Sequence, residues 1–226
     1  MTPQGIARWW GPVRRHGLTV RRSFLVATLA GTLVIGGGVA VHAALGERTG
    51  KGVGGCFNPT DYGGVPNDAQ DDRVPIQSAL DDAVAAGGGT VCVNAGRWRL
   101  SRAPAGSYDN HAALSTHGAH IAITGTGPGT VLDLVGDQGG GATAVISLDP
   151  GATDITVDRL TIDTSGATNT DEQTHAIAIG SGICNTANGT CSMPVSDVTV
   201  REVNFIHPAL NGFRKGDCIR VLGNTA

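Results

Sequence analysis

The chain has 226 residues, with 16 basic and 19 acidic side chains and a formal net charge of −3. Its 35 glycines, 4% aromatic and 15% charged residues argue against a helical bundle, a coiled coil or a disordered tail, and favour short strands joined by turns. Residues 45–226 are acidic overall, which argues against a nucleic-acid partner.

Residues 1–44 are predicted to be an export signal. Arg21 and Arg22 precede an uncharged apolar run over 24–41, and small residues around Ala43 suit a cleavage site. Paired arginines followed by Phe-Leu are typical of the twin-arginine pathway. The alternative is a membrane anchor, because residues 24–41 are just long enough to cross a bilayer. Both alternatives predict a protein that is secreted or held at the cell surface.

The remainder divides into a flexible, glycine-rich linker over 45–55 and one folded region over 56–226. One amphipathic helix is expected near the start of this region. Asp71 or Asp72 caps it and Gly87 ends it. Its apolar stripe consists of Ile76, Ala79, Leu80, Ala83 and Val84.

Five cysteines lie in the exported part, where an oxidising compartment favours disulfides. Cys184 and Cys191 flank a short polar loop and are the first predicted pair. Cys56 with Cys92 is the second predicted pair, and the odd number leaves Cys218 over.

Short strands follow the helix and repeat. Residues Asp154–Ile162 align with Asp197–Phe205 at an offset of 43, and Ala176–Ile179 align with Cys218–Val221 at an offset of 42. Earlier strands are predicted over 90–93, 97–100, 121–124, 131–134 and 145–148.

This repeat predicts a solenoid, because one rung cannot bury its apolar face alone and must stack on the next. We expect an all-β fold, a right-handed parallel β-helix with an N-terminal capping α-helix. Loops are expected at 163–174 and 206–216, and the β-helix is expected to be incomplete at its C-terminus, because Ala226 directly follows a strand. The alternative, an antiparallel sandwich, fits the aligned repeat less well.

Several motifs of residues 57–135 carry a family likeness. They are Asp61-Tyr62-Gly63, Asp71-Asp72, Ile76-Gln77, Gly87-Gly88-Gly89-Thr90-Val91 and Gly125-Thr126-Gly127. Together they resemble the start of the pectate-lyase superfamily, namely the rhamnogalacturonase/epimerase-like pectate lyases related to the glycoside hydrolase 28 polygalacturonases. Residues 136–226 match by the style of the repeat. The motifs are mostly architectural, so they indicate the fold more specifically than the reaction.

The resemblance implies a protein that acts on, or binds, a uronate-containing polysaccharide as a lyase or a glycosidase. An acidic polysaccharide is therefore the expected partner, and Ca²⁺ is an expected cofactor if the reaction is a lyase reaction. The alternatives are a non-catalytic surface or phage-tail-like carbohydrate-binding module, and a truncated inactive fragment.

Polygalacturonase-like enzymes resemble one another in an Asn-Thr-Asp, an Asp-Asp, a Gly-His-Gly and an Arg-x-Lys motif. Asn169-Thr170-Asp171 matches the first, and Gly216-Asp217 matches the second with Gly in place of its first Asp. The two lie about one repeat too far apart, and the last two motifs are absent from the chain.

Glycoside hydrolysis requires two carboxyl groups, whereas a lyase requires a base for the C5 proton and a cation for the uronate. We predict catalytic roles for Asp217, Asp171 and His207, and substrate binding by Lys215, Arg220 and His175. The competing interpretation makes Asp171 and Asp217 solvated loop and turn residues. No metal site is predicted, since the histidine and cysteine spacings carry no ligand signature. Trp98 either stacks on a sugar ring or belongs to the core.

Overall fold

The computed structural model describes residues 55–104, 112–139, 142–169, 173–180, 194–206 and 216–221. Several predictions lie outside these ranges, namely the export signal or anchor over 1–44, most of the linker over 45–55, the pair Cys184–Cys191, and Asp171, His207 and Lys215. No helix in the described ranges is long and apolar enough to cross a membrane.

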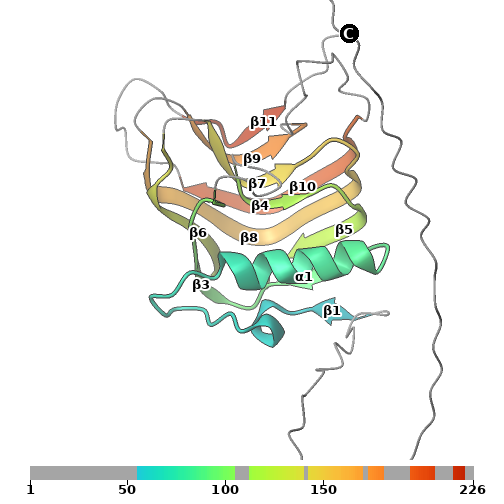
Figure 1. The fold of residues 1–226 in the computed structure, drawn as a ribbon, viewed down its shortest axis with the longest axis horizontal. Coiled ribbons are helices and arrows are strands. Elements are labelled where there is room, and N and C mark those ends of the chain that lie inside the picture. The colour runs from blue at the N-terminus through green and yellow to red at the C-terminus, as the bar shows by residue number, and fades with distance from the viewer. Residues whose placement is uncertain are drawn as a thin grey trace, which may run out of the picture. The chain divides into compact units, whose positions relative to one another are not determined.

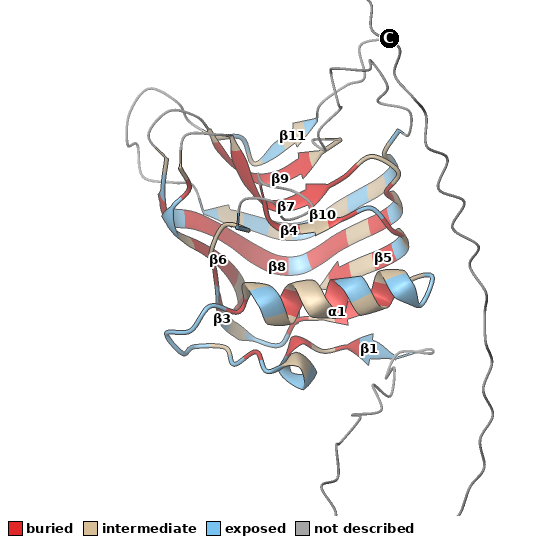
Figure 2. Cartoon of the chain, viewed as in Figure 1, coloured by how far each residue is buried: buried red, intermediate tan, exposed pale blue. Residues whose placement is uncertain are grey.

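The described part begins with β1 (Cys56–Phe57), the single 3₁₀ turn η1 (Pro59–Tyr62), α1 (Arg73–Ala85) and β2 (Gly89–Cys92). The predicted helix is therefore confirmed. Its stripe of Ile76, Ala79, Leu80 and Ala83 is buried, whereas Val84 is half-buried. Figure 2 shows this buried face alternating with exposed turns along α1.

The two candidate capping residues have different roles at the start of α1. The Oδ1 atom of Asp71 accepts a hydrogen bond from the backbone N–H of Arg73 at 3.0 Å. Asp72 occupies the N-cap position, but its Oδ1 accepts from the backbone N–H of Val65 instead. Asp71 thus satisfies one of the orphan helix donors, while Asp72 fixes the preceding loop. After α1 the chain turns at Gly87, whose φ is +82°.

Nine further strands follow in two sheets. They are β3 (Gly96–Leu100), β4 (Ala112–Thr116), β5 (Ala119–Thr124), β6 (Thr130–Asp137), β7 (Thr143–Leu148), β8 (Thr153–Thr168), β9 (Thr174–Ile179), β10 (Ser196–Ile206) and β11 (Ile219–Val221). The first sheet has the order β1-β2-β5-β8-β6-β3, with β10 also paired to β8, and the second has the order β11-β9-β7-β4 (Figure 1).

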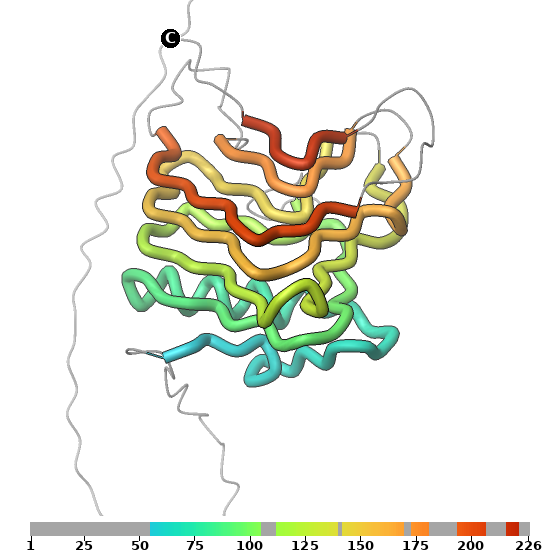
Figure 3. Tube along the Cα trace, turned by 180° about the vertical axis from the view of Figure 1, so that it is seen from behind, coloured from blue at the N-terminus to red at the C-terminus, as the bar shows by residue number. Residues whose placement is uncertain are grey.

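Every strand pair in the described ranges is parallel. The antiparallel sandwich is therefore wrong. The tube in Figure 3 shows the strands stacked on one another in chain order, with β5, β8 and β10 in successive levels. The fold is thus a mostly parallel β structure with one α-helix, and α1 packs against β1, β2, β4 and β5.

The repeat offsets of the sequence reappear as strand registers. Val198 pairs with Ile155 on β10 and β8, an offset of 43 residues, and Ile219 pairs with Ile177 on β11 and β9, an offset of 42. The alignment of the two copies is therefore confirmed as spatial stacking. The predicted loop over 163–174 is wrong in its first half, because β8 continues to Thr168 and pairs with β6.

One backbone position is left-handed on three successive rungs. His120, Asp154 and Asp197 have φ values of +58°, +53° and +54°, and the registers place them beside one another on β5, β8 and β10. Histidine and aspartate are among the non-glycine residues that tolerate this conformation best. The aligned Asp of the two repeat copies is therefore explained by a shared bend at the start of each strand.

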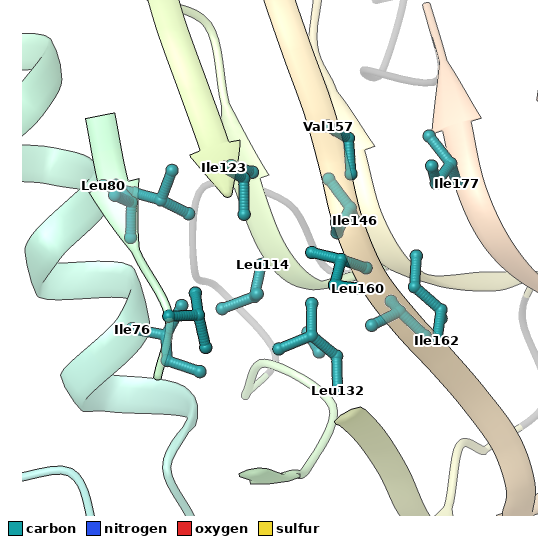
Figure 4. Packing of buried hydrophobic residues seen from close by; sticks show 14 of the residues in the cluster. Ile76, Leu80, Leu114, Ile123, Leu132, Ile146, Val157, Leu160, Ile162 and Ile177 are labelled. Carbon is teal, nitrogen blue, oxygen red and sulfur yellow. The ribbon is translucent and has the colours of Figure 1, made fainter. Parts of the chain in front are cut away.

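Ladders of identical or similar apolar side chains fill the space between the sheets. Leu114, Ile146 and Ile177 pair in register along the second sheet. They belong to one buried cluster with Leu132 and Leu160 of the first sheet (Figure 4). Trp98 has no exposed surface, so it belongs to the core and does not stack on a sugar. Burial of such side chains supplies the main driving force for stacking the rungs.

The disulfide in the described part joins Cys56 to Cys92, with their Cα atoms 5.4 Å apart. It ties the short strand β1 to the end of β2 and confirms the second of the two predicted pairs. Cys218 lies on the opposite sheet, next to β11, and takes no part in this bond.

Candidate functional site

Three of the predicted site residues come together on the second sheet. His175 lies on β9, while Asp217 and Arg220 flank and occupy β11. Parallel pairing of these strands places Arg220 beside Ala178 and Asp217 at the level of His175. Asp171, His207 and Lys215 lie outside the described residues, so the other half of the predicted site is not part of this geometry.

His175 contacts the other two residues through both ring nitrogens. Its Nε2 lies 2.9 Å from Nη1 of Arg220. Its Nδ1 lies 3.0 Å from the backbone nitrogen of Asp217 and 3.4 Å from Oδ2 of the same residue. Arg220 is held from a second side, because its Nη1 also donates to Oε1 of Gln173 at 3.1 Å.

Two hydrogen-bond donors therefore converge on one imidazole ring. A guanidinium and a backbone N–H are both donors and cannot accept a hydrogen bond. A neutral histidine has a single acceptor nitrogen. The tautomer protonated at Nδ1 accepts from Arg220 and faces the Asp217 carboxylate, and the tautomer protonated at Nε2 accepts from the Asp217 backbone. A doubly protonated ring can accept from neither donor.

Burial and charge keep the ring neutral. Desolvation lowers the pKa of His175 below its ordinary value, and the positive charge of Arg220 lowers it further. The Asp217 carboxylate acts in the opposite direction but does not outweigh them. At neutral pH we therefore expect an uncharged imidazole beside a charged guanidinium.

Exposure separates the roles of the three residues. The His175 side chain is 3% exposed, whereas that of Asp217 is 55% exposed. Arg220 is half-buried. His175 thus lies beneath the two charged groups and positions them, while Asp217 and Arg220 are the groups that a ligand can reach. A carboxylate and a guanidinium that contact the two nitrogens of one imidazole ring can bind a carboxylate-bearing sugar and exchange a proton with it.

Gly216 explains the departure from the Asp-Asp motif. A Cβ atom at this position would overlap the carbonyl oxygen of Thr174 on the neighbouring strand. No aspartate can therefore precede Asp217 in this backbone, and Asp217 is the single carboxylate of that motif.

Gln173 and a second charged cluster carry no local sequence signal and were not predicted. The Nη1 atom of Arg97 lies 2.9 Å from carboxylates of both Asp133 and Asp163, which are buried. These residues come from β3, β6 and β8, and only their stacking brings them together. Among the described residues, no group of three histidine, cysteine or acidic side chains is arranged to hold a metal ion.

Comparison with known proteins gives partial matches. No protein-family profile matches the chain. The mannuronan C5-epimerase AlgE3 of Azotobacter vinelandii is 41% identical over 81 residues, which are 36% of this chain and 4% of that protein. The epimerase AlgE5 of the same organism is 33% identical over 118 residues, which are 49% of this chain and 11% of that protein. The chain therefore spans a small part of the curated relatives it matches.

Among solved structures, the A-module of the A. vinelandii mannuronan C5-epimerase AlgE4 is 22% identical, with a TM-score of 0.40, over 73% of this chain and 41% of the other. About a third to a half of the chain is thus similar in sequence to short stretches of mannuronan C5-epimerases.

Proposed function

We propose that this chain is an exported β-helix protein of the pectate-lyase type that acts on a uronate-containing polysaccharide by removing the proton at C5. The observation that carries the proposal is the cluster of His175, Asp217 and Arg220 on β9 and β11. The similarity to mannuronan C5-epimerases supports the choice of a uronate polymer. The parallel stacking supports a right-handed solenoid with α1 as its N-terminal cap, and the disulfide Cys56–Cys92 supports an oxidising compartment outside the cytoplasm.

The chemistry follows from the acidity of the C5 proton. Loss of that proton leaves an electron pair that the neighbouring carboxylate delocalises, and a cation on this carboxylate stabilises the resulting charge. Arg220 supplies that cation, held in place by His175 and Gln173. Asp217 is the exposed carboxylate at the other nitrogen of the same imidazole and is a proton acceptor for the sugar. In this proposal Asp171, His207 and Lys215 complete the site.

Two outcomes branch from the same intermediate. Expulsion of the oxygen substituent at C4 cleaves the chain and leaves a double bond, which is the lyase outcome. Return of a proton to the opposite face of C5 inverts that centre, which is the epimerase outcome. A glycosidase would instead hydrolyse the bond without touching C5.

The test follows C5 directly. The full chain is incubated with polymannuronate and with polygalacturonate in D₂O, with and without Ca²⁺. Nuclear magnetic resonance follows deuterium at C5, and absorbance follows unsaturated uronide. Deuterium at C5 without absorbance identifies an epimerase. Absorbance without deuterium at C5 identifies a lyase, because elimination leaves C5 in a double bond with no hydrogen. New reducing ends without either signal identify a glycosidase and contradict C5 chemistry. If the folded protein gives no signal at all, it is a binding module or an inactive fragment.

Matched variants assign the residues. Asp217→Asn and Arg220→Gln should each reduce the rate by about 10²-fold or more, because each removes one charge that the transition state requires. Asp197→Asn is the control, since Asp197 is an exposed residue of β10 in a left-handed conformation that asparagine also adopts. Equal activity in all three variants would show that the cluster is not the site.

A further inference from the structure

A second polar surface lies on the first sheet. A groove of about 850 Å³ crosses β2, β5 and β8, and its lining residues include Thr124, Thr156, Asp158, Arg159 and Arg201. Cys56 and Cys92 lie at its β1 end, so the disulfide borders it. His175, Asp217 and Arg220 belong to the other sheet and do not line it. The groove is therefore separate from the candidate site described above.

One row of side chains in this groove comes from residues that pair across adjacent strands. Cys92 pairs with Thr124, Thr124 with Asp158, and Asp158 with Arg201. Side chains at paired positions of parallel strands point to the same face. The row therefore offers a hydroxyl, a carboxylate and a guanidinium at the spacing of adjacent strands of about 4.8 Å.

Asp158 is the buried centre of the groove. Its side chain is 4% exposed, and its Oδ2 accepts from Nη2 and Nε of Arg201 at 2.9 and 3.2 Å. Nε of Arg159 lies 3.7 Å from the same oxygen. The other oxygen, Oδ1, is buried and has no hydrogen-bond partner in the described part of the chain. A buried carboxylate oxygen without a donor is costly, and a ligand hydroxyl can remove that cost.

The charges of the groove favour an anion. One carboxylate, Asp158, faces two guanidiniums, those of Arg159 and Arg201, so the three together carry one net positive charge. The arginine side chains are 50% and 64% exposed, which leaves N–H groups directed to solvent. His120 lies at another edge of the groove, but Oδ2 of Asp154 contacts its Nδ1 at 2.7 Å. The anion-binding part is therefore the Asp158–Arg159–Arg201 group.

The geometry points to a non-catalytic glycan-binding groove on the first sheet, in which Arg159 and Arg201 bind the carboxylates of a polyuronate and Asp158 accepts from a sugar hydroxyl. A guanidinium matches a carboxylate through two parallel hydrogen bonds, and Thr124 and Thr156 supply hydroxyl groups for the same chain. The choice of a uronate ligand rests on the proposed function, whereas the preference for an anion rests on the groove itself.

Such a groove would hold a long polymer at a second point. Binding one chain at two places on the same protein raises the local concentration of the remaining sugar residues at the site on the second sheet. Removal of the groove should therefore weaken the apparent affinity for long polymers more than for short oligomers.

The test measures binding rather than turnover. The full chain is titrated with a mannuronate hexamer, a galacturonate hexamer and the neutral cellohexaose, and amide shifts of Thr124 and Thr156 are followed by nuclear magnetic resonance. The titration is done in the Arg220→Gln background, so that a failure of the site on the second sheet does not affect the result. We expect saturable shifts with at least one uronate hexamer, no saturation with cellohexaose, and weakening by about tenfold in Arg201→Gln.

Matched variants keep the test decisive. Arg99→Gln removes an exposed arginine of β3 outside the groove and should leave binding unchanged. Arg201→Lys keeps the charge but not the paired hydrogen bonds, and should fall between wild type and Arg201→Gln. Equal binding of cellohexaose, or full binding by Arg201→Gln and Arg159→Gln, would overturn the proposal. An absence of any shift at Thr124 and Thr156 would overturn it as well, whether or not the protein turns over polyuronate.

Discussion

The hydroxyl groups of Thr153 and Ser196 lie 2.8 Å apart across a parallel strand pair, although 43 residues separate them in sequence. Arg201 and Asp158 are also 43 residues apart, and the guanidinium of Arg201 donates to the carboxylate of Asp158. Equivalent positions on β8 and β10 are therefore 43 residues apart, which is the length of one rung at this point of the chain. Because each rung contacts mainly the next, a substitution acts on the strands stacked directly beside it.

Loss of the disulfide between Cys56 and Cys92 should lower the free energy of unfolding by about 2–4 kcal/mol, because the bond closes a loop and restricts the unfolded chain. The two cysteines are 36 residues apart in sequence. Denaturant unfolding of Cys56→Ser measures the loss. The double variant Cys56→Ser/Cys92→Ser should lose the same amount, since both changes break one bond. A much larger loss in the double variant would contradict the pairing.

Substitution of Arg97 by Met should destabilise the protein by about 2 kcal/mol. The change leaves the buried carboxylates of Asp133 and Asp163 without their shared cation. Breaking a wholly buried ion pair costs about 3–5 kcal/mol, and the value here is smaller because solvent screens the half-exposed Arg97. Denaturant unfolding at neutral pH gives the number.

The ion pair of Arg97 with Asp163 predicts that the stability of the protein depends on pH. Burial alone raises the pKa of Asp163, but hydrogen bonds from Ser165 and Arg97 outweigh it and hold the pKa below its ordinary value. The stability from this group is present above about pH 4 and is lost as the pH falls through the folded-state pKa. The difference between wild type and Arg97→Met should therefore shrink below about pH 4. A difference that grows with acid would contradict this account.

The two charged neighbours of His175 should move its pKa in opposite directions. Removal of the positive charge in Arg220→Gln should raise the pKa of His175, and removal of the negative charge in Asp217→Asn should lower it. Titration of the imidazole resonances by nuclear magnetic resonance measures both. Shifts of the same sign in the two variants would show that the contacts in solution differ from those described here.

The lowered pKa of His175 also affects stability. Below about pH 6.5 the unfolded chain protonates this histidine while the folded protein does not, so folding opposes proton binding. The contribution is complete above that pH and is lost as the pH falls toward the folded-state pKa. Unfolding of wild type and His175→Gln from about pH 8 to 5 should show the steeper fall in wild type. Parallel curves would mean that His175 titrates normally.

Replacement of Gly216 by Ala should displace β11 and destabilise the protein by about 1–3 kcal/mol, the usual cost of forcing an atom into occupied space. The new Cβ would overlap the carbonyl oxygen of Thr174. Gly129→Ala is the matched control, because no heavy atom lies within 4 Å of its Cβ. If the cluster on β9 and β11 is the active site, Gly216→Ala should also lose activity, while Gly129→Ala keeps it.

Local sequence signals predicted the helix and most strands. The apolar stripe predicted α1. The alternating segments predicted strands whose observed ends differ from the predicted ones by one or a few residues. Three elements were missed, β1, η1 and β4 (Ala112–Thr116). The end of β8 was also missed, because its polar residues Asp163 and Thr164 suggest a loop. The buried carboxylate of Asp163 is stabilised by Arg97, which lies 66 residues earlier in the sequence.

The contact among three of the six predicted site residues could be anticipated from the sequence only in part. The sequence put His175, Asp217 and Arg220 forward as functional residues, and the stacking of β9 and β11 does bring them into contact. It did not distinguish the buried His175 from the exposed Asp217, because burial depends on neighbours from other rungs. The aligned repeat copies do put Asp158 and Arg201 at equivalent positions 43 residues apart, but only the structure shows that they line a groove.

The sequence by itself determined the stacking of the rungs, because an apolar pattern repeated every 42 or 43 residues can be buried only when equal positions pair in register. The tertiary structure alone decided which polar side chains meet. Charged contacts such as Arg97 with Asp163, or Arg220 with His175, join residues of different strands. Their distances are set by the backbone positions of stacked strands, and no local spacing encodes them.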